Sequence, residues 1–267
     1  MKAYNFDLTA YLQRIHYDSE IESTIGCLRR LHFSQRHTIP FENFDIQLGR
    51  PMDLAPEHLF RKLVGSSRGG YCFELNGLFL SALQEIGFDA RPLLGRVHLS
   101  GEATGRGHQI SLVTIDKRQW VTDVGFGGDT PNAPVPLEIN TPIEMEGQTL
   151  RITKSKNFGF MLQTLRESAW RNLYSFDLEH VCQGDIDYGN HYTSTNPSSI
   201  FVKNRIAALP SKNGLLTLFN NTFKSVSGGK ESCVEIKDGQ EYLDLLEREF
   251  GVRLDVPFSS LKSTSPE

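Results

Sequence analysis

Three residues that together can form a nucleophilic site occur in order along this chain: Cys72, His108 and Asp123. A thiolate nucleophile needs a nearby base, and that base needs a group that orients it. An imidazole between a thiol and a carboxylate meets both needs, because it forms a thiolate–imidazolium pair while the carboxylate selects the imidazole tautomer. The pattern predicts a cysteine-protease-like Cys-His-Asp triad with Cys72 as the nucleophile.

Of the four cysteines, Cys72 has the setting that best suits a nucleophile. It stands in the first turn of an expected helix, where unpaired N–H groups and the helix dipole favour a thiolate. The preceding Arg68–Gly70 segment is expected to leave the sulfur open to substrate, and the Arg68 cation to favour the charged form. A buried structural role is the usual alternative for a cysteine. We keep that interpretation for the other three, Cys27, Cys182 and Cys233.

The spacing of His108 and Asp123 is a geometric problem. In a tight hairpin that closes at residues 115 and 120, Asp123 would face Leu112, which lies about 13 Å from His108 at ~3.3 Å per residue. Asp123 would then lie on the same sheet face as His108, but the distance between the two residues would be too long for a hydrogen bond. A bulge, a shifted register or strong barrel curvature is therefore required. His98 is the rival base, although it has no evident carboxylate partner.

Hydrophobic periodicity divides the chain into three expected domains. Residues 1–89 have the apolar spacing of helices and carry the cysteine nucleophile. Residues 90–189 are rich in β-branched and aromatic residues at strand spacing, which predicts a β-barrel or sandwich that carries the histidine and the aspartate. Residues 190–267 mix the two patterns. The expected fold class is α+β.

Local signals predict where the helices of the first domain begin and end. Ser19–Glu22 has the form of a capping box, which predicts a helix start there. Pro40 should end that helix, and Pro56 should begin the next one. A third helix should start at Cys72 and end at Gly87.

Composition narrows the class of protein. The 267 residues are 39% hydrophobic and 22% charged, as in ordinary globular proteins, and the net charge is −4. The sequence has no run of basic residues of the kind that indicates nucleic-acid binding. It also has no apolar stretch long enough to indicate a signal peptide or a membrane span. The cysteines form no CxxC pair or Cys/His cluster, so neither zinc nor a disulfide scaffold is indicated. We expect a cytoplasmic protein.

Several segments, in order, resemble the arylamine N-acetyltransferase family over nearly the whole chain. The matching segments are Ile39–Asn43, Arg68–Asn76, the strand that starts at His108, Asp123–Gly128, and Asn190–Tyr192 with Thr195, Pro197, Ser199 and Phe201. The chain lacks the long insertion of vertebrate members, which indicates the prokaryotic type. The resemblance implies an N-terminal helical domain, a central β-barrel and a C-terminal α/β lid.

The resemblance also implies an acyltransferase of xenobiotic metabolism. Members of the family transfer an acetyl group from acetyl-CoA to an arylamine or arylhydrazine by a ping-pong mechanism, and many O-acetylate N-hydroxyarylamines. The positions that match the family's triad are Cys72, His108 and Asp123. An acetyl-cysteine intermediate is therefore expected. Acetyl-CoA is the implied cofactor, as a co-substrate, and no metal is implied.

Further contacts follow from the resemblance alone. The positions expected to contact acetyl-CoA are Thr104, Gly105, Gly127, Tyr192 and Ser198. The expected acceptor-pocket positions are Phe41, Tyr71 and Phe126, each of which would otherwise be interpreted as an ordinary core residue. Glu42 and Arg68 should form an ion pair that positions the residues just before Cys72, Arg68–Tyr71, which we call the cysteine loop. Gly107, next to the histidine, predicts a roomier or more mobile acceptor pocket.

The expected partners are acetyl-CoA and a small-molecule arylamine or hydrazine acceptor, with no nucleic acid and no membrane, and the chain is expected to be a monomer or weak homodimer. Two other classes remain open. A cysteine hydrolase or transglutaminase-like enzyme can use the same triad, but a hydrolase would release acid from a loaded ester without an amine. A non-catalytic binding protein would have an inert Cys72.

Overall fold

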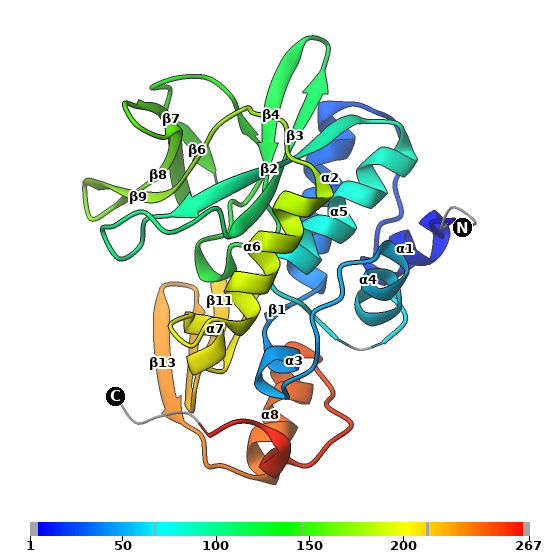
Figure 1. The fold of residues 1–267 in the computed structure, drawn as a ribbon, viewed down its shortest axis with the longest axis vertical. Coiled ribbons are helices and arrows are strands. Elements are labelled where there is room, and N and C mark those ends of the chain that lie inside the picture. The colour runs from blue at the N-terminus through cyan, green and yellow to red at the C-terminus, as the bar shows by residue number, and fades with distance from the viewer. Residues whose placement is uncertain (1–4, 67, 146, 212–213, 264–267) are drawn as a thin grey trace.

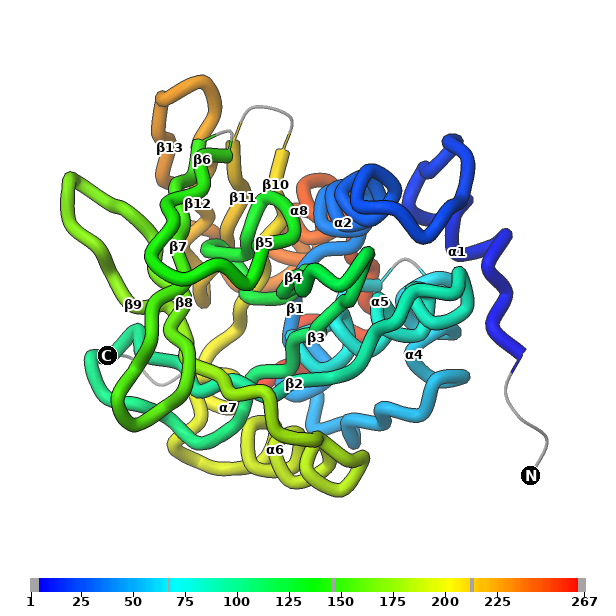
Figure 2. Tube along the Cα trace, turned by 90° about the horizontal axis from the view of Figure 1, so that it is seen from above, coloured from blue at the N-terminus to red at the C-terminus, as the bar shows by residue number. Residues whose placement is uncertain are grey.

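The computed structural model describes residues 5–66, 68–145, 147–211 and 214–263 of the chain. Figure 1 and Figure 2 show three parts: a group of helices, a large curved sheet, and a smaller sheet with a helix beside it. The helices of the first part are α1 (Leu8–Arg14), α2 (Ile25–Thr38), α3 (Phe44–Gln47), α4 (Pro56–Leu63) and α5 (Cys72–Ile86). In the part of the chain that the structure describes, no helix is both long enough and apolar enough to cross a membrane.

The start of α2 differs from the prediction. The helix begins at Ile25, so the start predicted from Ser19–Glu22 is wrong. Thr24 caps the helix instead, because its side chain accepts a hydrogen bond from the Cys27 N–H at 3.3 Å. The Thr24 N–H donates to the Glu22 carbonyl at 2.8 Å, a tight turn that a helix running through these residues would not allow.

The other predicted helix limits are confirmed. α2 ends at Thr38 because the residue before Pro40 has an extended backbone. α4 begins at Pro56, whose missing N–H costs nothing at a helix start. α5 begins at Cys72 and ends at Gly87, whose φ of +97° is a left-handed cap that glycine adopts without strain. Local sequence therefore determines both ends of the helix that carries the cysteine.

An antiparallel sheet in the described residues forms an almost closed barrel. Its strands are β2 (Asp89–Val97), β3 (His108–Ile115), β4 (Arg118–Thr122), β5 (Val135–Pro136), β6 (Ile143–Met145), β7 (Gln148–Ser155), β8 (Gly159–Arg166) and β9 (Ala169–Phe176). They pair in the order β5-β4-β3-β2-β9-β8-β7-β6. A parallel bridge joins Ile139, just after β5, to Ile152 on β7, and it brings the two ends of the sheet together. The expected β-barrel is confirmed, and α5 packs against β2 and β3.

The register of β3 and β4 differs from the simple hairpin considered above. Asp116 and Lys117 both have positive φ, +50° and +66°, and they form a two-residue turn that pairs Ile115 with Arg118. The ladder then ends where Ser111 pairs with Thr122. This register is two residues tighter than a hairpin closed at residue 120. It keeps the sheet face of Asp123 but brings that residue nearer to the start of β3.

The remaining elements form the third part of the molecule. They are α6 (Gln183–Thr195), α7 (Ile200–Lys203), β10 (Ile206–Ser211), β11 (Gly214–Phe219), β12 (Thr222–Ser227), β13 (Lys230–Glu235) and α8 (Gln240–Phe250). β1 (Phe41–Glu42), from the first part, pairs with β10 at the edge of the smaller sheet. The domain boundary expected at residues 189 and 190 lies inside α6. In Figure 1, α6 runs in front of the other elements as the link between the barrel and this part.

Candidate active site

Cys72 is the first residue of α5 and only 3% exposed. Its Sγ atom lies 3.7 Å from the carbonyl oxygen of Gly107, the residue before β3. The first N–H groups of a helix have no partner within the helix, so the helix dipole favours a negative charge on this sulfur. The sulfur therefore lies where the start of a helix meets the start of a strand.

His108 is the first residue of β3 and is buried. Its Nε2 atom donates a hydrogen bond to Asp123 Oδ2 at 2.7 Å, and Cys72 is close enough to raise the pKa of the ring. The rings of Phe126 and Tyr174 pack against the imidazole at 4.8 and 4.9 Å between centroids. The structure thus brings together the three residues of the predicted triad.

The electrostatics of this group depend on burial and on charge partners. Burial alone would lower the pKa of His108, but the Asp123 carboxylate and then Cys72 outweigh it and raise that pKa to about 10. Burial would likewise raise the pKa of Asp123, but the His108 cation, with hydrogen bonds from Asn76 and the Gly125 N–H, holds it below its usual value. Both groups are therefore charged at neutral pH, and a cationic imidazole beside Cys72 favours the thiolate.

Asp123 follows β4 and is held against the start of α5. Its Oδ1 atom accepts hydrogen bonds from Asn76 Nδ2 and from the Gly125 N–H, each at 2.9 Å. A Cβ on Gly125 would lie 3.1 Å from the Leu75 Cβ and 3.2 Å from the Cys72 Cα. Because glycine has no Cβ, the barrel chain lies directly on the first turn of α5, and the carboxylate reaches the same site as the thiol.

The glycines before Cys72 have a different role from the one expected. A Cβ on Gly69 would lie 2.1 Å from the Pro40 carbonyl oxygen, and a Cβ on Gly70 would lie 2.8 Å from the Glu74 side chain. Both glycines are buried. The interpretation of this segment as a flexible, open approach to the sulfur is therefore wrong. The glycines allow close contact between the cysteine loop and its neighbours.

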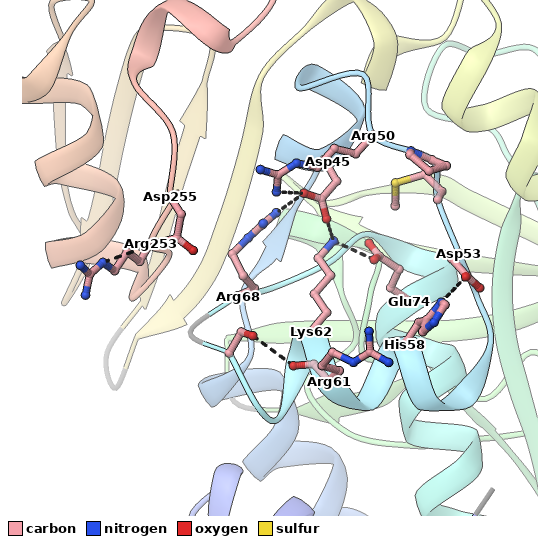
Figure 3. Close-up of a pocket in the computed structure, with 13 residues that line it drawn as sticks. Asp45, Arg50, Asp53, His58, Arg61, Lys62, Arg68, Glu74, Arg253 and Asp255 are labelled. Carbon is pink, nitrogen blue, oxygen red and sulfur yellow. Dashed lines mark hydrogen bonds and ion pairs between the residues drawn. The ribbon is translucent and has the colours of Figure 1, made fainter.

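A largely buried ion-pair network includes Arg68, and Figure 3 shows its members Asp45, Lys62, Arg68 and Glu74. Arg68 contacts Glu42 Oε1 at 2.9 Å and Asp45 Oδ1 at 3.0 Å, so the predicted Glu42–Arg68 pair is confirmed. The Lys62 ammonium lies 2.7 Å from Asp45 Oδ2 and 2.7 Å from Glu74 Oε1. Two carboxylates thus compensate the charge of Arg68 within the loop.

Glu74 connects this network to the nucleophile. Its Oε2 atom accepts a hydrogen bond from the N–H of Tyr71, the residue before Cys72, at 3.1 Å. The Glu42 N–H donates to the Gly70 carbonyl at 2.9 Å from the other side of the loop. The network borders a cavity of about 560 Å³, which Figure 3 shows. The cysteine loop is therefore positioned by side chains whose charges are paired.

The other cysteines and the rival base have other surroundings. His98 Nε2 pairs with Ser175 Oγ at 2.9 Å, a hydroxyl and not a carboxylate. Cys27 is fully buried, with its Sγ atom 3.2 Å from the Tyr17 hydroxyl. Cys182 and Cys233 are exposed, so the buried structural role expected for these two cysteines is wrong. The contacts of a nucleophile are thus those of Cys72.

The three expected acceptor-pocket residues lie in two places. Phe126 contacts the triad directly through the His108 ring. Phe41 and Tyr71 both pack against Phe201 of α7, at 5.9 and 5.7 Å between centroids. Tyr71 is fully buried, and its hydroxyl donates to the side-chain oxygen of Asn190 on α6. Tyr71 therefore ties the cysteine helix to α6, and its hydroxyl has a protein partner.

The five positions expected to contact acetyl-CoA lie on three segments. Thr104 and Gly105 are exposed in the loop between β2 and β3. Tyr192, on α6, is 59% exposed, and Ser198 is exposed between α6 and α7. Gly127 begins a short turn after the Asp123 segment and has a φ of +74°, which favours glycine.

Gly107 does not open space beside the histidine. A Cβ there would lie 2.9 Å from Oγ1 of Thr193, a buried residue of α6. A Cβ on Gly189 of the same helix would lie 2.8 Å from the Arg106 carbonyl oxygen. These two glycines let α6 lie directly on the segment that precedes His108. The roomier pocket expected from Gly107 is therefore wrong, because α6 fills that space.

Sequence reasoning assigned no role to several residues that surround the triad. Asn76 follows Cys72 by one helical turn, so this spacing already placed it on the same helix face. His32 lies in the buried stripe of α2, where a polar residue among apolar ones was the available signal. For Tyr174, on β9, no signal was present, because its contact with His108 depends on how the barrel closes.

Comparisons with known proteins agree with this arrangement. The family model of the N-acetyltransferases matches residues 24–259. The arylamine N-acetyltransferase / N-hydroxyarylamine O-acetyltransferase of Salmonella typhimurium is 38% identical over 250 residues, which cover 92% of this chain and 88% of the relative.

Solved structures extend the similarity to the fold. The arylamine N-acetyltransferase of Salmonella typhimurium has a TM-score of 0.88 at 36% identity, with 92% of this chain and 90% of that chain covered. The Mycobacterium marinum arylamine N-acetyltransferase in complex with CoA has a TM-score of 0.86 at 34% identity, with 92% of each chain covered. This chain therefore belongs to the arylamine N-acetyltransferase family and is an acyltransferase.

Proposed function

We propose that this protein transfers the acetyl group of acetyl-CoA to arylamines by a ping-pong mechanism through an acetyl-Cys72 intermediate. The observation that carries the proposal is the buried group of Cys72, His108 and Asp123, in which the imidazole donates to the carboxylate at 2.7 Å and Cys72 is close enough to raise the pKa of the ring. The family name and a relative whose structure contains CoA support the choice of acceptor and donor.

In the first half-reaction, the Cys72 thiolate attacks the carbonyl carbon of acetyl-CoA. The bond between that carbon and the CoA sulfur breaks as the new thioester forms. His108, which is cationic at neutral pH, gives its proton to the departing CoA sulfur. One thioester replaces another, so no strong driving force is needed to load the enzyme.

In the second half-reaction, the nitrogen of an arylamine attacks the acetyl-cysteine. His108, now neutral, accepts the proton of that nitrogen as the Cys72 sulfur leaves as a thiolate. The products are the acetylated amine and the original thiolate–imidazolium pair. Throughout both steps, Asp123 holds the Nε2–H edge of the imidazole, which leaves Nδ1 to face the thiol and the reacting atoms.

We assign the acceptor site to the aromatic side chains near the triad. Arylamines are weak bases and neutral at pH 7, so an apolar pocket suits them. Phe126 is the candidate for direct ring contact, while Phe41 and Tyr71 would form the wall toward α7. Arylhydrazines fit the same chemistry, and O-acetylation of N-hydroxyarylamines is proposed from the name of the Salmonella typhimurium relative.

We assign the donor site to three segments: the loop before β3, the turn that begins at Gly127, and the region from α6 to the start of α7. The proposed acetyl-CoA contacts are Thr104, Gly105, Gly127, Tyr192 and Ser198. Backbone N–H groups near the positive-φ Gly127 suit phosphate or thioester oxygens.

The test is to incubate the protein with acetyl-CoA alone and to measure its intact mass and the modified peptide. We expect a gain of one acetyl group on Cys72 that persists until a 4-substituted aniline discharges it. Cys72→Ala should show no gain, while Cys182→Ala, the matched control at an exposed cysteine, should load normally. An adduct that disappears without amine would indicate a hydrolase, and the absence of any adduct would refute the proposal.

A further inference from the structure

The peptide unit between Asp123 and Val124 is held by side chains instead of by a strand. The pairing of β3 and β4 ends at Thr122, so the next residues have no ladder partners. The Asp123 carbonyl oxygen accepts a hydrogen bond from His32 Nε2 at 2.9 Å. The Val124 N–H donates to Asn76 Oδ1 at 2.9 Å. Helices α2 and α5 thus hold opposite sides of one peptide unit in the barrel chain.

The geometry determines the tautomer of His32. A carbonyl oxygen can only accept, so the proton of the ring must be on Nε2. The side chain is fully buried, and its Nδ1 atom has no partner among the residues that the structure describes. A proton on Nδ1 would therefore be buried and unsatisfied. The ring also packs edge-on against Phe79 of α5, at 5.9 Å between centroids, which holds its plane.

The charges around His32 keep it neutral. Burial and then the Arg36 cation lower the pKa of His32 to about 3, against the opposing pull of Asp123; His37 also lowers it slightly. The neighbour from α5, Phe79, carries no charge. His32 therefore does not compete with His108 for the Asp123 carboxylate.

We propose that His32 is a positioning residue for the triad. Together with Asn76, it holds the peptide unit after Asp123 so that the carboxylate faces His108 Nε2. The proposal rests on the proposed function, because it assigns His32 a role in that same site. A core histidine that merely filled volume would be replaceable by leucine, whereas a positioning histidine requires its donor.

The experiment compares His32→Leu with His32→Gln in the full chain. Leucine fills the space and removes the donor, while the glutamine amide can place a donor near Nε2. Leu28→Ala, one turn earlier on the same buried face of α2, controls for loss of stability. The two measurements are the rate of Cys72 alkylation by iodoacetamide at neutral pH and the pKa of His108 from the NMR titration of its ring.

We expect His32→Leu to slow alkylation by about 10- to 100-fold and to lower the pKa of His108 by about one unit, because the carboxylate is no longer held in place. His32→Gln should recover most of both values, and Leu28→Ala should keep both despite a lower Tm. A folded His32→Leu protein with wild-type alkylation and His108 titration would overturn the proposal, as would a Leu28→Ala protein with the same losses.

A measurement on the unsubstituted protein covers the case in which His32→Leu does not fold. The ring ¹⁵N shifts of His32 should show the neutral Nε2–H tautomer across the neutral range, and a His32 that becomes charged near neutral pH would overturn the proposal. The two hypotheses can fail separately. If wild-type Cys72 is inert to alkylation, the proposed function fails; if it reacts normally in all variants, only the role of His32 fails.

Discussion

The Nε2 atom of His108 lies 2.7 Å from the Oδ2 atom of Asp123, although the strand pairing between their segments ends one residue before the aspartate. A two-residue turn brings Asp123 nearer along the sheet, and Asn76 and the Gly125 N–H then hold its other oxygen. The contact therefore depends on side chains from a helix as much as on the barrel.

The protonation of His108 can be measured directly. We expect its ring to stay cationic through the neutral range and to lose its proton as the pH rises through about 10. In Asp123→Asn the pKa should fall well below the wild-type value, because burial is then opposed by Cys72 without the carboxylate. An NMR titration of the histidine rings tests both statements. A wild-type His108 that titrates near 6.5 would contradict them.

Asp123→Asn should also lower the rate of acetyl transfer by about 10³- to 10⁴-fold, because an amide can donate to Nε2 and so favour the wrong imidazole tautomer. The assay is steady-state acetylation of a 4-substituted aniline. Asp244→Asn, at an exposed position of α8, is the matched control and should keep wild-type rates. Normal turnover in Asp123→Asn would remove Asp123 from the mechanism.

Gly125→Ala should push the backbone that follows Asp123 away from α5. Its Cβ would approach Leu75, Asn76 and Cys72 within 3.1 to 3.2 Å, so the chain must shift by a few tenths of an ångström. We expect a loss of about 10- to 100-fold in kcat/KM, since catalytic geometry tolerates little displacement. Gly26→Ala meets only ordinary contacts and should retain activity. Equal rates for the two variants would show that the close approach is not needed.

Gly107 and Thr193 should be energetically coupled. Gly107→Ala is expected to reduce stability by about 1–3 kcal/mol because its Cβ overlaps Thr193 Oγ1. In a Thr193→Ala background, most of that cost should disappear. A double-mutant cycle from urea unfolding measures the interaction, which we expect to exceed about 0.5 kcal/mol. Strictly additive effects on the free energy of unfolding would mean that α6 shifts away from the start of β3 at no energetic cost.

The ion-pair network that includes Arg68 should make stability depend on acid pH. Burial opposes the charge of Asp45, but Lys62 and Arg68 outweigh it and lower its pKa to about 2. Because an unfolded aspartate titrates near 3.9, Asp45 contributes stability above about pH 4 that is lost as the pH falls through about 2.

The size of this contribution is at most about 2 to 3 kcal/mol. Urea unfolding at pH 5 and near pH 2.5 should therefore show a smaller difference for Asp45→Asn than for the wild type. Asp129→Asn removes an exposed ion pair and should keep the wild-type difference. If the difference in stability between the two pH values is unchanged in Asp45→Asn, Asp45 is not the source of the acid sensitivity.

Much of the framework could be predicted from local sequence. Pro40, Pro56 and Gly87 limit helices by steric rules that act within a few residues, and the structure confirms each limit. The same rules put Cys72 at a helix start. The start of α2 was mispredicted from the capping-box form of Ser19–Glu22, because Thr24 caps the helix instead through its hydrogen bond with the Cys27 N–H.

By itself, the sequence determined the identities and order of Cys72, His108 and Asp123, the helix start at the thiol and the sheet face of the carboxylate. The distances within the site were decided by the tertiary structure. Asp123 depends on Asn76, which is 47 positions away, and on His32, which is 91 away. Local steric rules determine turns and helix ends, but contacts between distant segments exist only once the barrel and the helices pack together.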